Sequence, residues 1–168
     1  VLSPYDTTWP HRFANERARL LDGLAPMRAY VEHVGSTAVP GLAAKPTIDV
    51  CVGIPSFDDV LPYLDRLQML GYTYVPALIA AMPERRFLWT GTPTDHTFHL
   101  HVVSKDGRDF SDLVFFRDYL RRHASEAARY EGVKRELASV VGTDIGEYVR
   151  GKVNVYKELL LNARSAGR

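Results

Sequence analysis

Cysteine and an excess of one charge are nearly absent from this chain, and each absence narrows what it can do. Cys51 is the only cysteine among 168 residues, so neither an intrachain disulfide nor a cysteine zinc cluster can form. The formal net charge of +1 provides no basic field that would attract DNA or RNA. No apolar run approaches the roughly 20 residues of a membrane span. We therefore expect a cytoplasmic protein that acts on small molecules, without a membrane partner and with nucleic acid only as a secondary hypothesis.

The remaining composition is that of an ordinary globular protein. Hydrophobic residues make up 46% of the chain and charged residues 24%, which argues against disorder and against a coiled coil. A chain of 168 residues buries a core without disulfides or metals to hold it together. We expect a single domain over residues 1–168.

A loop with two glycines separates two apolar runs, residues 29–34 and 47–54, which we interpret as strands. Gly35 lets backbone N–H groups turn toward a ligand without a Cβ in the way. Ser36 adds a hydrogen-bond donor and Lys45 a positive charge. Such a loop fits an anion, most often a phosphate group.

One carboxylate interrupts the second apolar run. Asp49 lies inside the expected strand, where an ionised carboxylate is costly to bury unless a cation or a donor lies opposite it. Next to a phosphate-type loop, it indicates a site for a nucleotide with a divalent cation, with Mg²⁺ or Mn²⁺ and ATP or another nucleoside triphosphate as the expected cofactors. An ion pair with Lys45 or with an arginine is the structural alternative for this carboxylate.

The order of the remaining elements predicts a mixed sheet covered by helices. Residue spacing, caps and turns predict helices over 10–24 and from Ser56 to Gly71, strands at 72–75, 86–91 and 97–103, and helices from Phe110 to the end. Residues 76–83 are left unassigned. This order indicates the α+β or α/β class with a helical C-terminal third.

Two histidines alternate along the last expected strand. Period-two alternation places His99 and His101 on one face, with the apolar residues between them on the other. Together with Asp49 they have the composition of a 2-His-1-carboxylate site, which suits Fe(II), Mn(II) or Zn(II). General acid or base chemistry on phosphate and a structural role are the alternatives.

Three basic residues are further candidates for anion binding. Arg117 and Arg121 lie one helical turn apart and could clamp a phosphate or carboxylate, unless they belong to a solvated face with Asp118. Arg86 begins the strand next to the histidine strand and could complete the anion pocket. Lys134 lies on a helix whose other face is core, so we expect it in solvent.

The segment 32–50, EHVGSTAVPGLAAKPTIDV, resembles the signature of the GrpB-like family of the nucleotidyltransferase superfamily. This family occurs as stand-alone proteins and as a C-terminal domain of some dephospho-CoA kinases. Other positions similar to the family are Tyr5-Asp6, Trp9-Pro10, Arg86, His99-x-His101, residues 116–121 and Lys134. The resemblance implies a nucleotidyltransferase-like α+β fold whose strand Asp49 binds the metal, with Ser36 and Lys45 on the phosphates. Arg86 and Arg117 would meet the charge of the acceptor or leaving group.

The chain departs from the superfamily pattern at two places. Nucleotidyltransferases carry a second carboxylate two residues after the first, and here that place is Cys51, a poor ligand for magnesium. The place of the third carboxylate falls near His99 and His101. We expect a nucleotide-dependent transferase or ligase that acts on a small molecule. The alternatives are a non-catalytic nucleotide or CoA-pathway binding module, and a mononuclear metalloenzyme using His99, His101 and Asp49.

Overall fold

The computed structural model describes residues 2–140 and 145–166. Its elements, in chain order, are α1 (Trp9–Leu24), β1 (Tyr30–Val34), the 3-10 helix η1 (Ser36–Ala38), β2 (Ile48–Ile54), η2 (Phe57–Asp59), α2 (Val60–Met69), β3 (Thr73–Tyr74), η3 (Pro76–Leu78), β4 (Arg85–Thr92), β5 (Asp95–Ser104), α3 (Arg108–Arg122), α4 (Ala124–Val140) and α5 (Ile145–Ala166). The predicted alternation of helices and strands is confirmed. The helix expected after Ser56 begins as a turn of 3-10 helix, and the unassigned stretch after β3 contains another.

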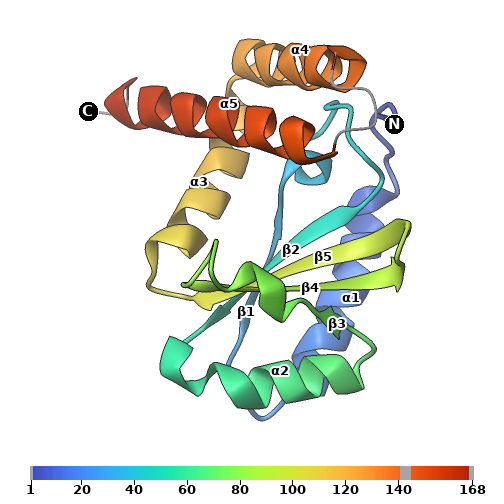
Figure 1. Ribbon diagram of the computed structural model, residues 1–168, viewed down its shortest axis with the longest axis vertical. Helices are drawn as coiled ribbons and strands as arrows, with labels where there is room; N and C mark the ends of the chain where they lie inside the picture. Colours follow the sequence, from blue (N-terminus) through green and yellow to red (C-terminus); the bar gives the residue numbers. More distant parts are fainter. Residues whose placement is uncertain (1, 141–144, 167–168) are drawn as a thin grey trace.

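The strands form one mixed sheet in the order β1-β2-β5-β4-β3. β2 runs parallel to β5, and the other neighbouring pairs are antiparallel. With helices around this sheet and a helical C-terminal third, the expected α+β class is confirmed (Figure 1).

Pairing across the sheet separates its side chains into two faces, because residues directly opposite each other point the same way. We call one the polar face; its members include Glu32, Asp49, Cys51, Arg85, Phe87, Trp89, His99 and His101. The other is the apolar face, whose members include Ile48, Val50, Val52, Leu88, Leu100 and Val102, all fully buried. The predicted alternation of the histidine strand is confirmed.

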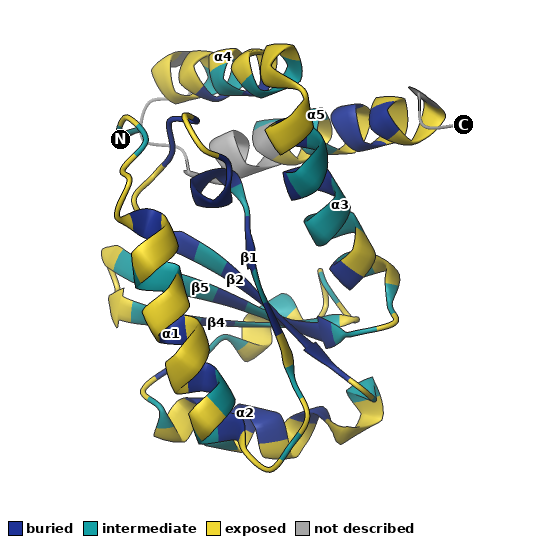
Figure 2. Cartoon of the chain, turned by 180° about the vertical axis from the view of Figure 1, so that it is seen from behind, coloured by how far each residue is buried: buried dark blue, intermediate teal, exposed yellow. Residues whose placement is uncertain are grey.

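Helices cover the two faces unequally. α1 and α2 lie against the apolar face, where Leu20, Leu24, Leu64 and Leu67 join the main core (Figures 1 and 2). On the polar face, Phe110 of α3 packs in a smaller cluster with Val34, Cys51 and Val103.

The last two helices pack onto the loop between β1 and β2. Val39 and Leu42 of this loop form a third cluster, whose other buried members are Phe116, Leu120, Tyr130, Leu159 and Leu160 of α3, α4 and α5. The C-terminal third of the chain therefore covers the predicted phosphate loop (Figure 1). Among the helices of the described ranges, none is long and apolar enough to cross a bilayer.

Candidate functional site

The loop between β1 and β2 begins with a close approach of backbone to carboxylate. Gly35 has φ of 72°, which favours glycine, and starts the turn into η1. A Cβ at this position would collide with the Asp49 carboxylate, because Oδ2 of Asp49 occupies that space. The sequence therefore places the strand carboxylate directly against the start of the loop.

Lys134 of helix α4 binds the loop between β1 and β2. This lysine is 2% exposed, and its Nζ donates to the carbonyl of Ala43 at 2.6 Å and to Oγ of Ser36 at 3.2 Å. From the same helix, Glu131 accepts a hydrogen bond from the Ala43 backbone N–H at 2.8 Å. The expected exposure of Lys134 is wrong, since the helix face that it shares with Tyr130 is the one that packs on the loop.

Asp49 lies beside both histidines of β5. Its Oδ1 is 3.3 Å from Nδ1 of His99 and 3.7 Å from Nε2 of His101. The Asp49 side chain is 23% exposed and that of His99 24% exposed, so solvent reaches both. The structure thus brings three of the predicted site residues together at the centre of the polar face.

Both ring nitrogens of His99 are engaged. Nδ1 faces Asp49, and Nε2 lies 2.9 Å from Nδ1 of His96, with the donor set by the tautomer. A metal ion bound through His99 would have to displace one of these contacts. Within the described ranges, no three His, Cys, Asp or Glu side chains are arranged to hold a metal ion. The geometry gives no support to a three-ligand site of His99, His101 and Asp49.

His101 is the more deeply buried of the two histidines. Burial lowers the pKa of its imidazole, and the hydrogen bond to Asp49 only partly offsets this. Nδ1 is buried without a hydrogen-bond partner among the described residues. His101 is therefore a neutral ring beside Asp49 at neutral pH.

Cys51 occupies the position of the missing second carboxylate. Its thiol is buried between β2 and α3, and burial raises its pKa to about 12. The group is protonated at neutral pH, so it is not a thiolate nucleophile. Cys51 thus packs as a small apolar side chain with Val34, Val103 and Phe110.

The two arginines that begin β4 point to opposite faces. Arg86 lies on the apolar face, with its guanidinium 4.8 Å from the ring centre of Phe57 and donating to the carbonyl of Pro83. The structure thus does not bring Arg86 to Asp49. Arg85 lies on the polar face and forms an ion pair with Asp109 at 2.9 Å. The sequence reasoning missed Arg85, because the strand begins one residue earlier than expected.

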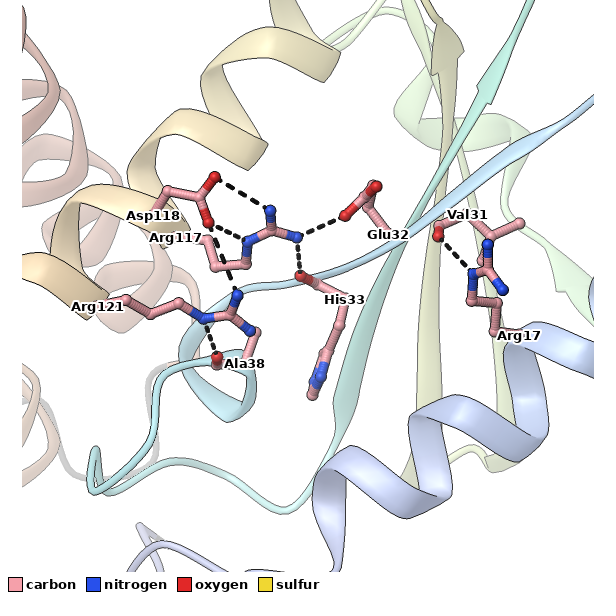
Figure 3. Close-up of polar contacts among 8 residues, drawn as sticks. All are labelled: Arg17, Val31, Glu32, His33, Ala38, Arg117, Asp118 and Arg121. Atoms are coloured by element: carbon pink, nitrogen blue, oxygen red, sulfur yellow. Dashed lines mark hydrogen bonds and ion pairs between the residues drawn. The ribbon is translucent and has the colours of Figure 1, made fainter.

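Arg117 is tied to groups of its own chain (Figure 3). Its NH1 donates to Oε2 of Glu32 at 2.7 Å and to the carbonyl of His33 at 3.0 Å, while Nε donates to Asp118 at 2.8 Å. Burial acts to lower its pKa, but the hydrogen bonds to Asp118 and Glu32 outweigh burial and raise it. The residue fixes α3 to β1.

Arg121, one turn further along α3, extends the same contact to the loop. Its Nε donates to the carbonyl of Ala38 in η1 at 2.8 Å, and NH1 lies 3.7 Å from Asp118 (Figure 3). The predicted pair of arginines thus exists, and it holds β1 and η1 together.

The far end of the loop lies beside His96. Lys45 is exposed, and Oγ1 of Thr47 donates to the carbonyl of His96 at 3.0 Å. Burial lowers the pKa of His96, and the charges of His99 and Lys45 lower it further. His96 was not among the predicted site residues, because it lies outside the strand expected at residues 97–103.

Two cavities in the described part of the chain lie away from Asp49. One of about 300 Å³ is lined by residues of η2, β5 and the start of α3, and one of about 390 Å³ by residues of α1 and α2. Neither is lined by a predicted site residue.

Comparison with known proteins identifies the family. The family model described as "GrpB protein" matches residues 1–161. A UPF0157 protein of Streptomyces coelicolor is 35% identical over 167 residues, covering 99% of this chain and 86% of the relative. A dephospho-CoA kinase of Mycolicibacterium paratuberculosis is 29% identical over 177 residues, covering 90% of this chain and 42% of the kinase.

Solved structures agree with this assignment. The conserved protein GrpB of Enterococcus faecalis has a TM-score of 0.82 and 30% identity, with 96% of this chain and 98% of that chain covered. The Cid1 poly(U) polymerase has a TM-score of 0.53 and 13% identity, covering 82% of this chain and 44% of the polymerase, a likeness of fold alone. The predicted resemblance is confirmed: this chain belongs to the GrpB protein family and has nucleotidyltransferase-like structural neighbours.

Proposed function

We propose that this protein binds a nucleoside triphosphate, ATP or another, with a divalent cation at the loop that begins with Gly35 and at Asp49. One observation carries the proposal: the carboxylate of Asp49 packs against the backbone of Gly35, where a side chain would exclude it. A cation ligand and a phosphate-type loop are thereby adjacent. Structures of the Cid1 poly(U) polymerase, which shares the fold, are described as bound to MgATP or to a UTP analogue.

The donor set fits magnesium or manganese held mainly by the ligand. Mg²⁺ keeps several waters and takes one or two protein carboxylates, with substrate phosphates completing its shell. Asp49 provides one such carboxylate, while the thiol of Cys51 is not an oxygen ligand of the kind that magnesium prefers. In this proposal Asp49 holds the cation, whose charge neutralises the phosphates.

The loop residues divide between binding and positioning. Ser36 and the neighbouring amides would face the phosphates, and Lys45, which is exposed, would add its charge. Lys134 and Arg117 would act through others, by holding the loop and β1 in place. His99 and His101 would orient the Asp49 carboxylate, and their catalytic role stays a prediction. Arg86 lies outside this proposed site, because it faces the apolar side.

Transfer to a small molecule is the reaction we propose, with an adenylylated product or an amide as its outcome. A non-catalytic binding module is the second candidate, and the buried Cys51 favours it, since only one carboxylate remains for metal-assisted transfer. The dephospho-CoA kinase relative makes a ligand of CoA metabolism one choice for such a module. Incubation with radiolabelled ATP and a broad set of acceptors separates the two, because only a transferase converts the nucleotide.

Calorimetric titration tests the binding itself. ATP, GTP, CTP and UTP are titrated with Mg²⁺ and with Mn²⁺ into the wild type, Asp49→Ala and Asp58→Ala. Asp58 is an exposed carboxylate of η2, on the helix-covered apolar side, and serves as the matched control. We expect Asp49→Ala to weaken binding at least tenfold and Asp58→Ala to leave it unchanged. The proposal fails if no nucleotide binds the wild type, or if Asp49→Ala binds as the wild type does.

A further inference from the structure

Two aromatic rings stack on each other at the turn of the β4–β5 hairpin. The rings of Trp89 and His96 lie 4.3 Å apart between centroids and 13° from parallel. Both residues are only partly buried, so the stack has exposed surface. Neither ring belongs to the main core or to the clusters under the C-terminal helices.

A β-bulge puts His96 on the polar face. Thr90 pairs with Phe98, but the next residue, Gly91, pairs with His96, which leaves Thr97 as an extra residue in β5. Strict alternation would place His96, three residues before His99, on the apolar face. Bulges are frequent beside active sites, where they redirect a side chain.

The bulge is built into the backbone at Gly91. This glycine has φ of 110°, and a Cβ there would collide with the carbonyl of Asp95. A side chain is therefore excluded from the position that creates the bulge. The irregular hairpin thus places the imidazole of His96 on the same face as Trp89.

Fixed contacts hold the stack close to Asp49. His96 lies 2.9 Å from His99, and its carbonyl accepts a hydrogen bond from Thr47 at the end of the loop. Asp49, His99 and Trp89 occupy directly opposite positions on β2, β5 and β4. Since the backbones of neighbouring strands lie about 4.8 Å apart, the Cα atoms of Trp89 and Asp49, two strands apart, are separated by roughly 10 Å.

We propose that Trp89 and His96 form an aromatic platform that stacks a planar heteroaromatic ring of the substrate. The inference rests on the proposed function. If the phosphates bind at Asp49, the base of the same nucleotide, or a ring of the acceptor bound next to it, can reach the stack of Trp89 and His96. Every nucleobase has a face for stacking, so the platform fits the ring without selecting one base. Recognition of this kind needs no net positive charge, in agreement with the near-neutral chain.

Paired ligands with and without a ring test the platform. ATP and inorganic tripolyphosphate, each with Mg²⁺, are titrated by calorimetry into the wild type, Trp89→Leu and Trp89→Phe. Loss of one stacking ring costs roughly 10- to 100-fold in affinity. We expect Trp89→Leu to weaken ATP by that factor and to leave tripolyphosphate unchanged, which also reports an intact fold. Trp89→Phe keeps a ring and should bind ATP within a few-fold of the wild type.

Adenosine distinguishes the two sources of the ring. Its binding to the wild type and to Trp89→Leu is followed by calorimetry in the presence of Mg²⁺ and tripolyphosphate, because Trp89→Leu also removes the tryptophan that would report binding by fluorescence. If the ring belongs to a separate acceptor, Trp89→Leu weakens adenosine but not ATP. If Trp89→Leu weakens neither ligand, the platform is refuted.

The two proposals fail in different ways. A wild type that binds neither ATP nor tripolyphosphate contradicts the phosphate site, whereas adenosine binding that is weakened in Trp89→Leu but kept in Trp89→Phe still supports the platform. Should Trp89→Leu not fold, His96→Ala removes the other ring and carries the same expectation. Equal ATP affinity in the wild type and a folded His96→Ala would then refute the platform.

Discussion

On the apolar face, Val50 and Leu100 are fully buried beneath α1 and α2, whereas their chain neighbours Asp49 and His99 on the polar face keep about a quarter of their side chains in solvent. Successive residues at these positions of β2 and β5 therefore alternate between the close-packed core and a face of hydrogen-bonded polar groups. Polar groups that are half withdrawn from water cost stability unless they are paired. Sites that break the pattern of a fold in this way are typical of function.

The largest expected difference between the faces is in stability. Leu100→Ala removes a fully buried side chain from the main core and should lower the free energy of unfolding by about 2–5 kcal/mol. His99→Ala, one residue away, removes hydrogen bonds that water can replace, and should cost less than about 1 kcal/mol. Urea unfolding followed by circular dichroism measures both. Equal losses would show that the polar face is part of the core.

Alternation in the sequence predicted which residues of a strand share a face. It did not predict which strands pair, or which residues lie opposite each other. Asp49 and His99 meet because β2 pairs with β5 in parallel, a pairing of residues about 50 positions apart. The bulge that turns His96, and the place of Arg85 rather than Arg86 on the polar face, depend on the register between β4 and β5.

Helix periodicity has a similar limit. It predicted which residues of α3 and α4 share a face, without showing which faces other parts of the chain cover. Lys134 is buried because α4 lies on the loop, and Arg117 is paired because α3 crosses β1 beside Glu32. Some of the basic residues that were candidates for ligand binding thus form contacts within the chain instead. The family signature indicates the loop and Asp49 as the site, and the structure places the start of the loop against the Asp49 carboxylate.

A buried histidine on the apolar face provides the second test. His33 stacks on Phe13 of α1 with ring centroids 4.7 Å apart, and its Nε2 lies 2.9 Å from Oγ1 of Thr37. Burial lowers its pKa from 6.5 to about 4. Because the unfolded state then binds the proton more readily, His33 reduces stability as the pH falls from about 6.5 to 4. At roughly 1.4 kcal/mol per pKa unit, the loss approaches about 3 kcal/mol.

The variant His33→Gln separates this effect from other titrations. Glutamine keeps a partner for Thr37 and removes the titrating ring, so the unfolding free energy should depend less on pH between 4 and 6.5. His101, whose pKa burial also lowers, contributes in the same direction in both proteins, so the difference between the two curves belongs to His33. Identical pH curves would show that the apolar face tolerates a charged imidazole.

The smallest expected effect concerns the contact between loop and carboxylate. Gly35 and Gly41 both have positive φ, 72° and 81°, but only at Gly35 would a Cβ meet another group, the Asp49 carboxylate. Alanine at either position carries the backbone penalty, roughly 1 kcal/mol. Gly35→Ala should cost about 1–2 kcal/mol more than Gly41→Ala in urea unfolding, because Asp49 must also leave its place beside the histidines.

The difference between these two variants measures how firmly the loop positions Asp49. If Gly35→Ala displaces the carboxylate, its contacts with His99 and His101 lengthen, and the pKa of the His101 imidazole, followed by NMR, falls further as the hydrogen bond and the charge of Asp49 withdraw. Gly41→Ala leaves this imidazole as it is. Equal stabilities and an unchanged titration of His101 would mean that Asp49 moves aside at no cost in stability. In that case the strands alone would hold the side chains of the polar face in position. The loop would constrain the Asp49 carboxylate only when a ligand is bound to it.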